Sequence, residues 1–458
     1  MKHWKLWGAA VMATGMILSC ATALATDYEG YTQEEFDALE KTTVIKSEDS
    51  PTGYYVTFRY KDADASRVRI YGQWSFSDML DATFYTSTDA TPDEWKDGYT
   101  VWKTGDWPTV DMEKDEETGI WSYTIPLPNG TWCYRYYVNG TEGAELTDYT
   151  DAEMIADPSN INYLADDVTE LGGEECLTSV YVPYDEEKQA HTIPHTEEAP
   201  REGENGTVFF VEDTTSGGIN TSYGVYLPYG FDKDREEAYP ILVLFHGGGG
   251  YDGSWLSNGL ANILDNMIAE GRVEPTIVVT PNGSDFPHET YRWDRPAILD
   301  FVVNNILPDM SENYNASTEA AHRAFAGLSM GGATAGYALF NNTDDFDTFA
   351  IFSAPFLGDV QPDYTMPELK EKNIFIGYGD YDFVVPRSLY KFEKDADGNL
   401  VPLSNGNSPS NVEGSIIEYI NGLSNEDVSF KTMHYPYGHD WILWRKLLVD
   451  VLDNVLWK

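Results

Sequence analysis

The segment Arg323-Ala-Phe-Ala-Gly-Leu-Ser-Met-Gly-Gly332 decides the fold of the second half of the chain. A short apolar strand pattern ends at Ala326, and a helical pattern begins at Met330. The pentapeptide between them fits G-x-S-x-G, in which the serine occupies a strained turn and the glycines let neighbouring backbone pass close to it. The segment therefore predicts a nucleophilic serine, Ser329, on a strand–turn–helix scaffold.

Apolar runs alternate with helical-period segments on both sides of this turn. The predicted strands are residues 241–245, 276–279, 324–326, 349–352, 373–376 and 428–433. The predicted helices are residues 260–269, 297–313, 330–340, 412–423 and 441–456. Strands that are apolar on both faces and alternate with helices indicate a mostly parallel sheet covered on each side. We therefore predict an α/β domain over residues 207–458.

A serine hydroxyl is a weak nucleophile at neutral pH and needs a neighbouring base. Of the eight histidines, His439 stands on the loop between the last predicted strand and the final predicted helix. In folds that carry a nucleophilic serine on a strand–turn–helix, the histidine that acts as its base lies on this loop. We expect His246 to brace its loop, and His434, inside the strand pattern, to be a hydrogen-bonded core side chain. His439 is the predicted base.

The acid that orients this histidine should follow the preceding strand. The segment Gly377-Tyr-Gly-Asp-Tyr-Asp382 lies there and offers two candidates. Asp382 is preferred because it lies further past the strand end, and Asp380 stays open as the alternative. Asp440 is adjacent to His439 in sequence and cannot readily orient its ring from below. The predicted order along the chain is serine, aspartate, histidine.

A glycine run, His246-Gly-Gly-Gly-Gly250, follows the first strongly apolar strand. In this kind of fold that loop supplies one backbone N–H to the oxyanion hole, and the residue after the nucleophile supplies the other. We assign these donors to Gly248 and Met330, with the first open by one residue. A phosphate-binding loop is disfavoured because no Gly-Lys-Ser/Thr follows.

Residues 26–165 have a different pattern, in which short alternating strands are separated by turn residues. The predicted strands are residues 55–60, 67–71, 121–125 and 132–138. Asn139-Gly140 after the last of them is a strong hairpin signal. Several such strands without a helical period indicate a β-sandwich, which the resemblance described below implies to be immunoglobulin-like. Residues 166–206, rich in Glu and Pro, are predicted as a linker with one strand near residues 179–182.

Composition excludes several classes of protein. The net charge is −47, from 29 basic and 76 acidic residues, which nearly excludes nucleic-acid binding and disfavours anionic membranes. With 42% hydrophobic and 14% aromatic residues the chain can bury sizeable cores, so it is not disordered. No Cys/His cluster has zinc-site spacing, and we expect neither a metal nor an organic cofactor. Whether Cys133 and Cys176 form a disulfide stays open.

Residues 1–25 have the anatomy of a secretory signal peptide. A basic start is followed by an apolar run over residues 6–18 and by the small-residue exit Ala23-Leu-Ala25. We expect cleavage before Thr26 and a secreted, extracellular protein. Two alternatives are lipidation at Cys20, which would anchor the chain at the cell surface, and an uncleaved membrane anchor. No later segment is apolar enough to span a bilayer.

Several motifs of the second half carry a resemblance to a known family. They are Tyr226-Leu-Pro-Tyr-Gly230, Tyr239-Pro-Ile-Leu-Val-Leu-Phe-His-Gly247, Asn262-Ile-Leu-Asp265, Ile268-Ala-Glu-Gly271, Pro281-Asn-Gly283, Arg323 to Gly332, Gly379-Asp-Tyr-Asp382 and Gly438-His-Asp-Trp441. On these motifs the chain resembles the feruloyl and acetyl-xylan esterases of carbohydrate esterase family 1, in the esterase-D-like group of α/β-hydrolases. Members place their acid as the fourth residue of a G-x-x-D segment, which favours Asp382.

The first half resembles the early-set domain that precedes such esterases and is related to family 48 carbohydrate-binding modules. This resemblance rests on Phe58-Arg-Tyr60, Val68-Arg-Ile-Tyr-Gly72, Gly119-Ile-Trp121, Tyr134-Arg-Tyr-Tyr-Val138 and Asp157-Pro158. The long acidic stretch 76–117 departs from the compact pattern of these domains. Four tryptophans in or next to this stretch form either a ligand platform or loop packing, so sugar binding by this domain stays open; they are Trp74, Trp95, Trp102 and Trp107.

Together these resemblances imply a secreted serine esterase that acts on esterified plant polysaccharide and releases ferulate or a related hydroxycinnamate from arabinoxylan. Alternatives are an acetyl-xylan esterase, an enterochelin-type siderophore esterase, and a carbohydrate-binding protein with a degenerate hydrolase domain. Phe286, Tyr291 and Trp293 follow Pro281-Asn-Gly283 and are predicted to line an acyl pocket, where an aromatic acid would stack. The alternative is that they are ordinary packing residues.

Overall fold

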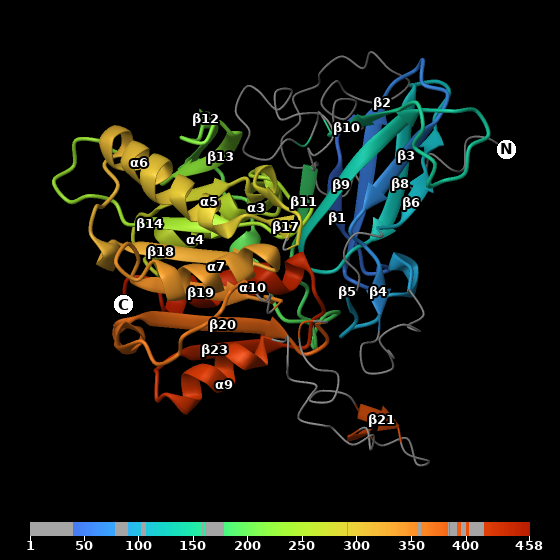
Figure 1. Ribbon diagram of the computed structural model, residues 1–458. Coiled ribbons are helices and arrows are strands. Elements are labelled where there is room, and N and C mark those ends of the chain that lie inside the picture. Colours follow the sequence, from blue (N-terminus) through green and yellow to red (C-terminus); the bar gives the residue numbers. More distant parts are fainter. Residues whose placement is uncertain are drawn as a thin grey trace.

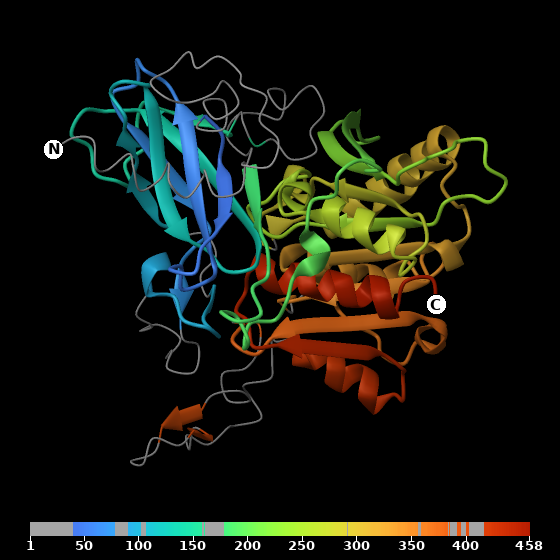
Figure 2. The same cartoon turned by 180° about the vertical axis from the view of Figure 1, so that it is seen from behind.

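The computed structural model describes most of the chain. The described residues are 40–77, 90–101, 107–157, 160, 178–290, 292–355, 359–382, 384, 392–394, 400–402 and 416–458. The predicted leader with Cys20, as well as Cys176 and Tyr291, lies outside these ranges. Within them, no helix combines the length and the apolar composition that crossing a bilayer requires. Figures 1 and 2 show a β-rich unit beside a larger α/β unit.

The β-rich unit consists of two main sheets that share one core. Its strands are β1 (Thr43–Lys46), β2 (Tyr54–Lys61), β8 (Ile120–Pro126) and β7 (Glu113–Lys114) in one sheet, and β10 (Ala152–Ile155), β9 (Gly130–Asn139), β3 (Val68–Gly72) and β6 (Thr109–Asp111) in the other. A small hairpin joins β4 (Phe76–Ser77) to β5 (Thr100–Val101). Phe58 of β2 meets Tyr134 of β9 across the core, with ring centroids 4.6 Å apart. The unit is therefore a β-sandwich.

Two details of this sandwich differ from the sequence patterns. Asn139-Gly140 does not close a two-residue hairpin, because the returning strand β10 pairs Ala152 with Asn139 after a longer loop. Asn139 still adopts the left-handed conformation, with φ 60°. Trp74 and Trp95, two aromatics considered for a ligand platform, are buried in the sandwich core.

The α/β unit is organised around an eight-stranded sheet. Its strands, in spatial order, are β12 (Thr207–Thr214), β13 (Asn220–Leu227), β15 (Ile277–Pro281), β14 (Ile241–Phe245), β18 (Arg323–Leu328), β19 (Thr348–Phe352), β20 (Asn373–Gly379) and β23 (Lys431–Tyr435). The pairings from β15 to β23 are parallel, and β12 and β13 add an antiparallel edge. This is the mostly parallel sheet that the sequence predicts.

Helices cover both faces of this sheet (Figures 1 and 2). On one face lie α5 (Arg295–Phe301), α6 (Leu307–Tyr314), α7 (Met330–Asn341) and α9 (Ile417–Asn425), and on the other lie α3 (Ser254–Ser257), α4 (Leu260–Ala269) and α10 (Trp441–Asn454). A π-helical turn, Val302–Ile306, connects α5 to α6. Short 3-10 turns lie at Pro92–Glu94, Thr196–Glu198, Gly283–Asp285, Ala320–His322 and Pro367–Glu371. Small two-stranded ribbons join β16 (Pro287–His288) to β17 (Arg292–Trp293) and β21 (Phe392–Lys394) to β22 (Leu400–Pro402).

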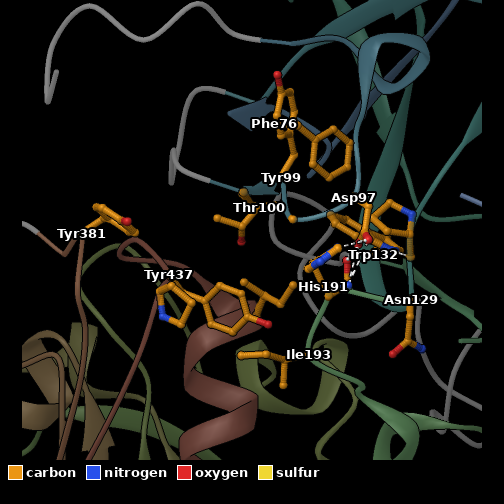
Figure 3. Close-up of a pocket in the computed structure, with 16 residues that line it drawn as sticks. Phe76, Asp97, Tyr99, Thr100, Asn129, Trp132, His191, Ile193, Tyr381 and Tyr437 are labelled. Carbon is orange, nitrogen blue, oxygen red and sulfur yellow. Dashed lines mark hydrogen bonds and ion pairs between the residues drawn. The ribbon is translucent and has the colours of Figure 1, made fainter. Parts of the chain in front are cut away.

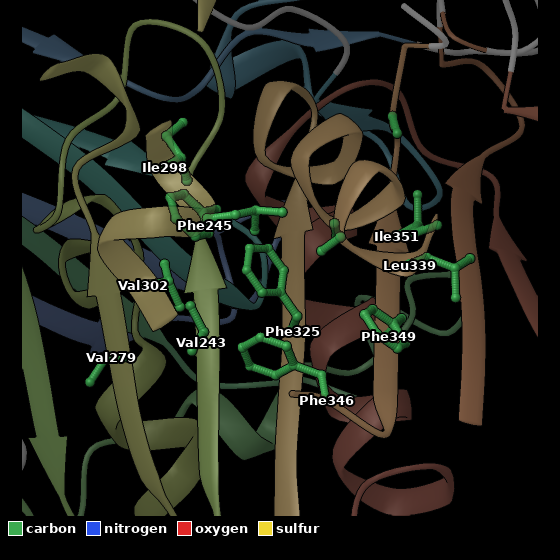
Figure 4. Packing of buried hydrophobic residues seen from close by; sticks show 14 of the residues in the cluster. Val243, Phe245, Val279, Ile298, Val302, Phe325, Leu339, Phe346, Phe349 and Ile351 are labelled. Atoms are coloured by element: carbon green, nitrogen blue, oxygen red, sulfur yellow. The ribbon is translucent and has the colours of Figure 1, made fainter. Parts of the chain in front are cut away.

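Alternation along the central strands explains why both faces need a cover. In β14, Val243 and Phe245 point into one hydrophobic cluster, whereas Leu242 and Leu244 point into the other. Figure 4 shows the first cluster, where Phe325 of β18 lies between Phe245 and Phe346. Because successive side chains of a strand point to opposite faces, an all-apolar strand is stable only between two layers of helices.

The segment predicted as a linker fixes the two units to each other. β11 (Thr178–Val182) pairs with β9 of the sandwich, where the sequence indicates one strand. Further along, Glu198 accepts the backbone N–H of Thr131 of the sandwich at 2.8 Å and forms an ion pair with Arg445 of α10 at 2.8 Å. His195 contacts the same carboxylate at 2.9 Å. Both charged side chains of the ion pair are only 2% exposed, so this junction is buried.

Replacing Glu198 by glutamine is expected to destabilise the protein by about 3–5 kcal/mol, because it leaves the buried Arg445 guanidinium without a counter-charge. Burial alone would raise the pKa of Glu198, but the charges of Arg445 and His195 outweigh it and lower this pKa from 4.5 to about 2. A lowered folded-state pKa stabilises the fold above the unfolded value and loses that effect as the pH falls towards the folded value. Urea unfolding should therefore show a difference that is full at pH 7 and shrinks below about pH 4.5.

The matched control is Glu204→Gln, in the same segment, whose side chain is exposed. It should leave the unfolding midpoint unchanged. An equal effect of the two substitutions would mean that the junction contributes nothing through its charge.

Candidate active site

Ser329 lies at the turn between β18 and α7 with φ 50° and ψ −115°. A non-glycine residue whose backbone is held in such a sparsely populated region costs about 1–3 kcal/mol, which the surrounding fold must offset. The neighbouring glycines make the turn sterically possible. A Cβ on Gly327 would lie 2.4 Å from the backbone of Gly331, and a Cβ on Gly331 would lie 2.3 Å from the carbonyl oxygen of His246. The structure thus has the strand, strained serine and helix that the motif predicts.

The structure brings Ser329, His439 and Asp382 together. His439 Nε2 lies 3.0 Å from Ser329 Oγ, and His439 Nδ1 lies 2.9 Å from Asp382 Oδ1. The three side chains follow β18, β23 and β20, whose carboxyl ends meet at one edge of the parallel sheet. With the carboxylate at Nδ1, that nitrogen carries the ring proton and Nε2 is free to accept the serine proton. The indole of Trp444 packs against the imidazole in a T-shaped arrangement, with centroids 4.9 Å apart.

The structure separates the two candidate acids. The carboxylate of Asp382 is fully buried and also accepts the backbone N–H of Val384 at 3.0 Å, which fixes its orientation. Asp380 turns away and lies 2.7 Å from Nδ1 of His434. The prediction that His434 is a core residue is wrong: its side chain is 51% exposed, because β23 is the edge strand of the sheet.

Asp440, adjacent to the histidine, has a different task. Its carboxylate caps α10 by accepting the backbone N–H of Ile442 at 3.2 Å and also accepts the side-chain amide of Gln73 at 2.6 Å. Complete burial raises the pKa of Asp440 to about 6. The side chain therefore holds the loop of His439 against the sandwich instead of orienting the ring.

The glycine loop after β14 lies beside the serine. A Cβ on Gly247 would lie 3.2 Å from the Cβ of Ser329, and one on Gly248 would lie 3.0 Å from Met330 Cγ. Among the described residues, no acceptor pairs with the backbone N–H of Gly248 or Met330. Met330 is also the first residue of α7, and a helix N-terminus favours negative charge. Both predicted donors are thus next to the serine and available to an anion.

His246 holds this loop in place, and Trp293 packs against His246. His246 is buried, with Nδ1 2.6 Å from the carbonyl oxygen of Gly247 and Nε2 accepting the N–H of Gly283 at 3.1 Å. Burial lowers the pKa of His246 to about 4, so the ring is neutral and acts as a brace. The indole of Trp293 meets it edge-on at 5.1 Å.

The described residues that were predicted to line an acyl pocket are buried in the core and expose little surface that an acyl group could contact. Trp293 is 4% exposed and Phe286 is 2% exposed, and both belong to the core on one face of the sheet. Tyr291 lies outside the described residues. Neither described ring offers an open face for stacking, so their substrate-binding role stays a prediction.

Two residues lie near the site although no sequence pattern indicates this position for them. Gln73 is far from Asp440 along the chain, and only the fold brings them into contact. Arg292 has φ 67°, and its guanidinium Nη1 lies 3.3 Å from the position of a Cβ on Gly248, at the rim of the glycine loop. In the part of the chain that the structure describes, no cluster of His, Cys, Asp or Glu is arranged to hold a metal ion.

The fold and this site define an α/β-hydrolase with a nucleophile elbow. The Esterase family model, described as "Putative esterase", matches residues 215–454, more than half of the chain. The chain therefore belongs to this family.

One curated relative is the endo-1,4-beta-xylanase/feruloyl esterase of Xylanibacter ruminicola, 27% identical over 274 residues. The match covers 58% of this chain and 34% of that relative, so the chain corresponds to about a third of its length.

Two solved structures are reported as similar to this chain. The ferulic acid esterase of Anaeromyces mucronatus has a TM-score of 0.46 and 19% identity, covering 58% of this chain and 96% of that one. The enterobactin esterase of Shigella flexneri has a TM-score of 0.48 and 16% identity, covering 94% of this chain and 99% of that one.

Proposed function

We propose that this protein is a serine carboxylic-ester hydrolase in which Ser329 is the nucleophile, His439 the general base and acid, and Asp382 the orienting acid. The observation that carries the proposal is the continuous hydrogen-bond chain from Ser329 Oγ through the imidazole to Asp382, with distances of 3.0 and 2.9 Å. A bystander serine in a glycine-rich turn needs no such partners.

The reaction has two halves. Ser329 Oγ attacks the ester carbonyl carbon while His439 Nε2 takes the hydroxyl proton, and Asp382 stabilises the imidazolium that forms. The carbonyl oxygen becomes an oxyanion, which accepts hydrogen bonds from the backbone N–H groups of Gly248 and Met330. Loss of one such donor typically costs about a hundredfold or more in rate.

The tetrahedral intermediate then collapses. His439 returns its proton to the leaving alcohol oxygen, the C–O bond breaks, and an acyl-serine remains. Water, deprotonated by the same imidazole, attacks the acyl carbon, and the second tetrahedral intermediate breaks its bond to Ser329 Oγ. His439 returns the proton to this oxygen, which releases the carboxylic acid and restores the serine. Every proton is carried by His439, so the steps balance with the ester and one water molecule as the only reactants.

The proposed substrate is a hydroxycinnamate ester of plant cell-wall polysaccharide, such as feruloylated arabinoxylan, and the protein is proposed to be secreted. The name of the Xylanibacter relative, which combines xylanase with feruloyl esterase, supports the substrate. The signal-like residues 1–25 support export.

A fluorophosphonate probe tests the nucleophile directly. The probe is expected to label the wild-type protein once, at Ser329, because only an activated serine reacts with it. Peptide mapping by mass spectrometry identifies the labelled residue. Labelling at another serine, or equal labelling of Ser329→Ala, would contradict the proposal.

A substrate panel tests the acyl group. Methyl ferulate, acetylated xylan and a catecholate trilactone differ in the acid that the acyl-enzyme must hold. The highest kcat/KM is expected for methyl ferulate. A clear preference for either of the other two would leave the esterase assignment standing and replace the substrate.

A further inference from the structure

A cavity of about 390 Å³ lies between the sandwich and the α/β unit. The sandwich contributes the β4–β5 hairpin and the start of β9, and the α/β unit contributes Tyr381, Pro436 and Tyr437. Figure 3 shows Tyr381 and Tyr437 on one side of the cavity, Trp132 and Asp97 on the other, and Thr100 between them. Its volume is in the range of small-ligand sites, about 300–1,000 Å³.

The position of this cavity relates it to the reaction. Tyr381 directly precedes Asp382, and Tyr437 stands two residues before His439. The loops after β20 and β23 thus form one wall, whereas the glycine loop after β14 lies on the other side of β18. The carbonyl oxygen of an ester must face the glycine loop, and its alcohol oxygen must face the histidine that protonates it. The wall formed by Tyr381 and Tyr437 thus belongs to loops on the histidine side of Ser329, the side on which the leaving alcohol is protonated.

The lining favours a neutral, hydroxyl-bearing ligand. Thr100 is only 5% exposed, and its hydroxyl oxygen Oγ1 has no hydrogen-bond partner among the described residues. A buried hydroxyl without a partner is costly and marks a place where a ligand group can bond. Among the described lining residues the one basic side chain, His191, is already paired with Asp97 at 2.7 Å, so the lining presents no free cation for an anionic ligand. Aromatic rings and prolines supply the apolar faces on which sugar rings stack.

We propose that this cavity is the subsite for the alcohol part of the substrate, a sugar unit of the esterified polysaccharide, with Thr100 as a hydrogen-bonding residue. This inference rests on the proposed function. The sandwich then contributes to specificity by forming half of a cavity next to the catalytic loops.

The test compares two esters of one acid that differ only in the alcohol: feruloylated xylo-oligosaccharide and methyl ferulate. Thr100→Val removes the hydroxyl and keeps the shape of a strand residue. It is expected to lower the ratio of kcat/KM for the sugar ester to that for the methyl ester by about fivefold or more, the value of one lost hydrogen bond. The methyl ester normalises for any loss of folded enzyme.

Thr124→Val is the matched control, because Thr124 is an exposed strand residue of the same sandwich outside the cavity. It should leave the ratio unchanged. In a Ser329→Ala background, calorimetric titration with the feruloylated oligosaccharide should show the same weakening for Thr100→Val without any turnover. An unchanged ratio and unchanged binding for Thr100→Val would overturn the cavity inference alone, whereas full hydrolysis by Ser329→Ala would overturn the proposed function.

Discussion

Replacement of Ser329 by alanine should lower kcat for 4-nitrophenyl acetate and methyl ferulate by about 10⁵-fold to 10⁶-fold, as removal of the nucleophile does in serine hydrolases of this type. The expected loss is large because no other group in the site can form the acyl intermediate. The oxyanion donors remain in the variant, so some rate enhancement over water should survive. Steady-state kinetics with a sensitive fluorogenic ester would measure both the loss in kcat and the residual rate enhancement over water.

The variant should fold as the wild type does, because alanine retains the Cβ that the strained turn already accommodates at φ 50°. Ser424→Ala, at an exposed position of α9, is the matched control and should keep full activity. Activity of Ser329→Ala above one per cent of wild type, in a preparation free of contaminating esterase, would rule out this serine as the nucleophile.

Replacement of Asp382 by asparagine should lower kcat by about 10⁴-fold. The amide keeps the size of the side chain but presents no negative charge to His439, so it neither stabilises the imidazolium nor fixes the reactive tautomer. Asp380→Asn offers a control of the same chemistry two residues away. Its carboxylate faces His434, and we expect less than about a tenfold loss, the scale of a surface ion pair.

The comparison of these two variants decides the acid. Both should be measured with methyl ferulate at saturating concentration, so that kcat is read without a contribution from binding. The assignment of Asp382 fails if Asp380→Asn is the more damaged enzyme.

The α/β half could be predicted closely because its signals are local. α4 spans Leu260–Ala269, the predicted range, and α10 begins at the predicted Trp441. Each of the six predicted strands overlaps a strand of the structure. Runs such as Ile241–Phe245 are apolar on both faces and need two covering layers, whereas the mixed run 428–433 was placed less well because β23 begins only at Lys431. The antiparallel edge strands β12 and β13 were not predicted, because mixed polar sequences such as Thr207–Thr214 resemble a surface loop.

The site itself was predicted in part for the same reason. The positions of Ser329, Asp382 and His439 follow from where strands end, so the sequence suffices to propose them. His434 was misplaced because the position of a strand within a sheet is a property of the topology and not of the strand. The contact between Gln73 and Asp440 had no sequence signal, because it joins two units that each look complete in isolation.

The buried capping carboxylate of Asp440 has a consequence for how such enzymes can be recombined. Asp440 is the neighbour of His439 in the chain, and one of its hydrogen-bond partners comes from the first half of the molecule. A hydrolase unit that begins at residue 207 would expose that carboxylate, together with Arg445, to solvent. It would also lose the contact with Gln73 that holds the loop of His439 in place. The sandwich and the hydrolase unit therefore cannot be exchanged independently between enzymes. A chimaeric protein that keeps the activity must include the whole chain from the first sandwich strand onward.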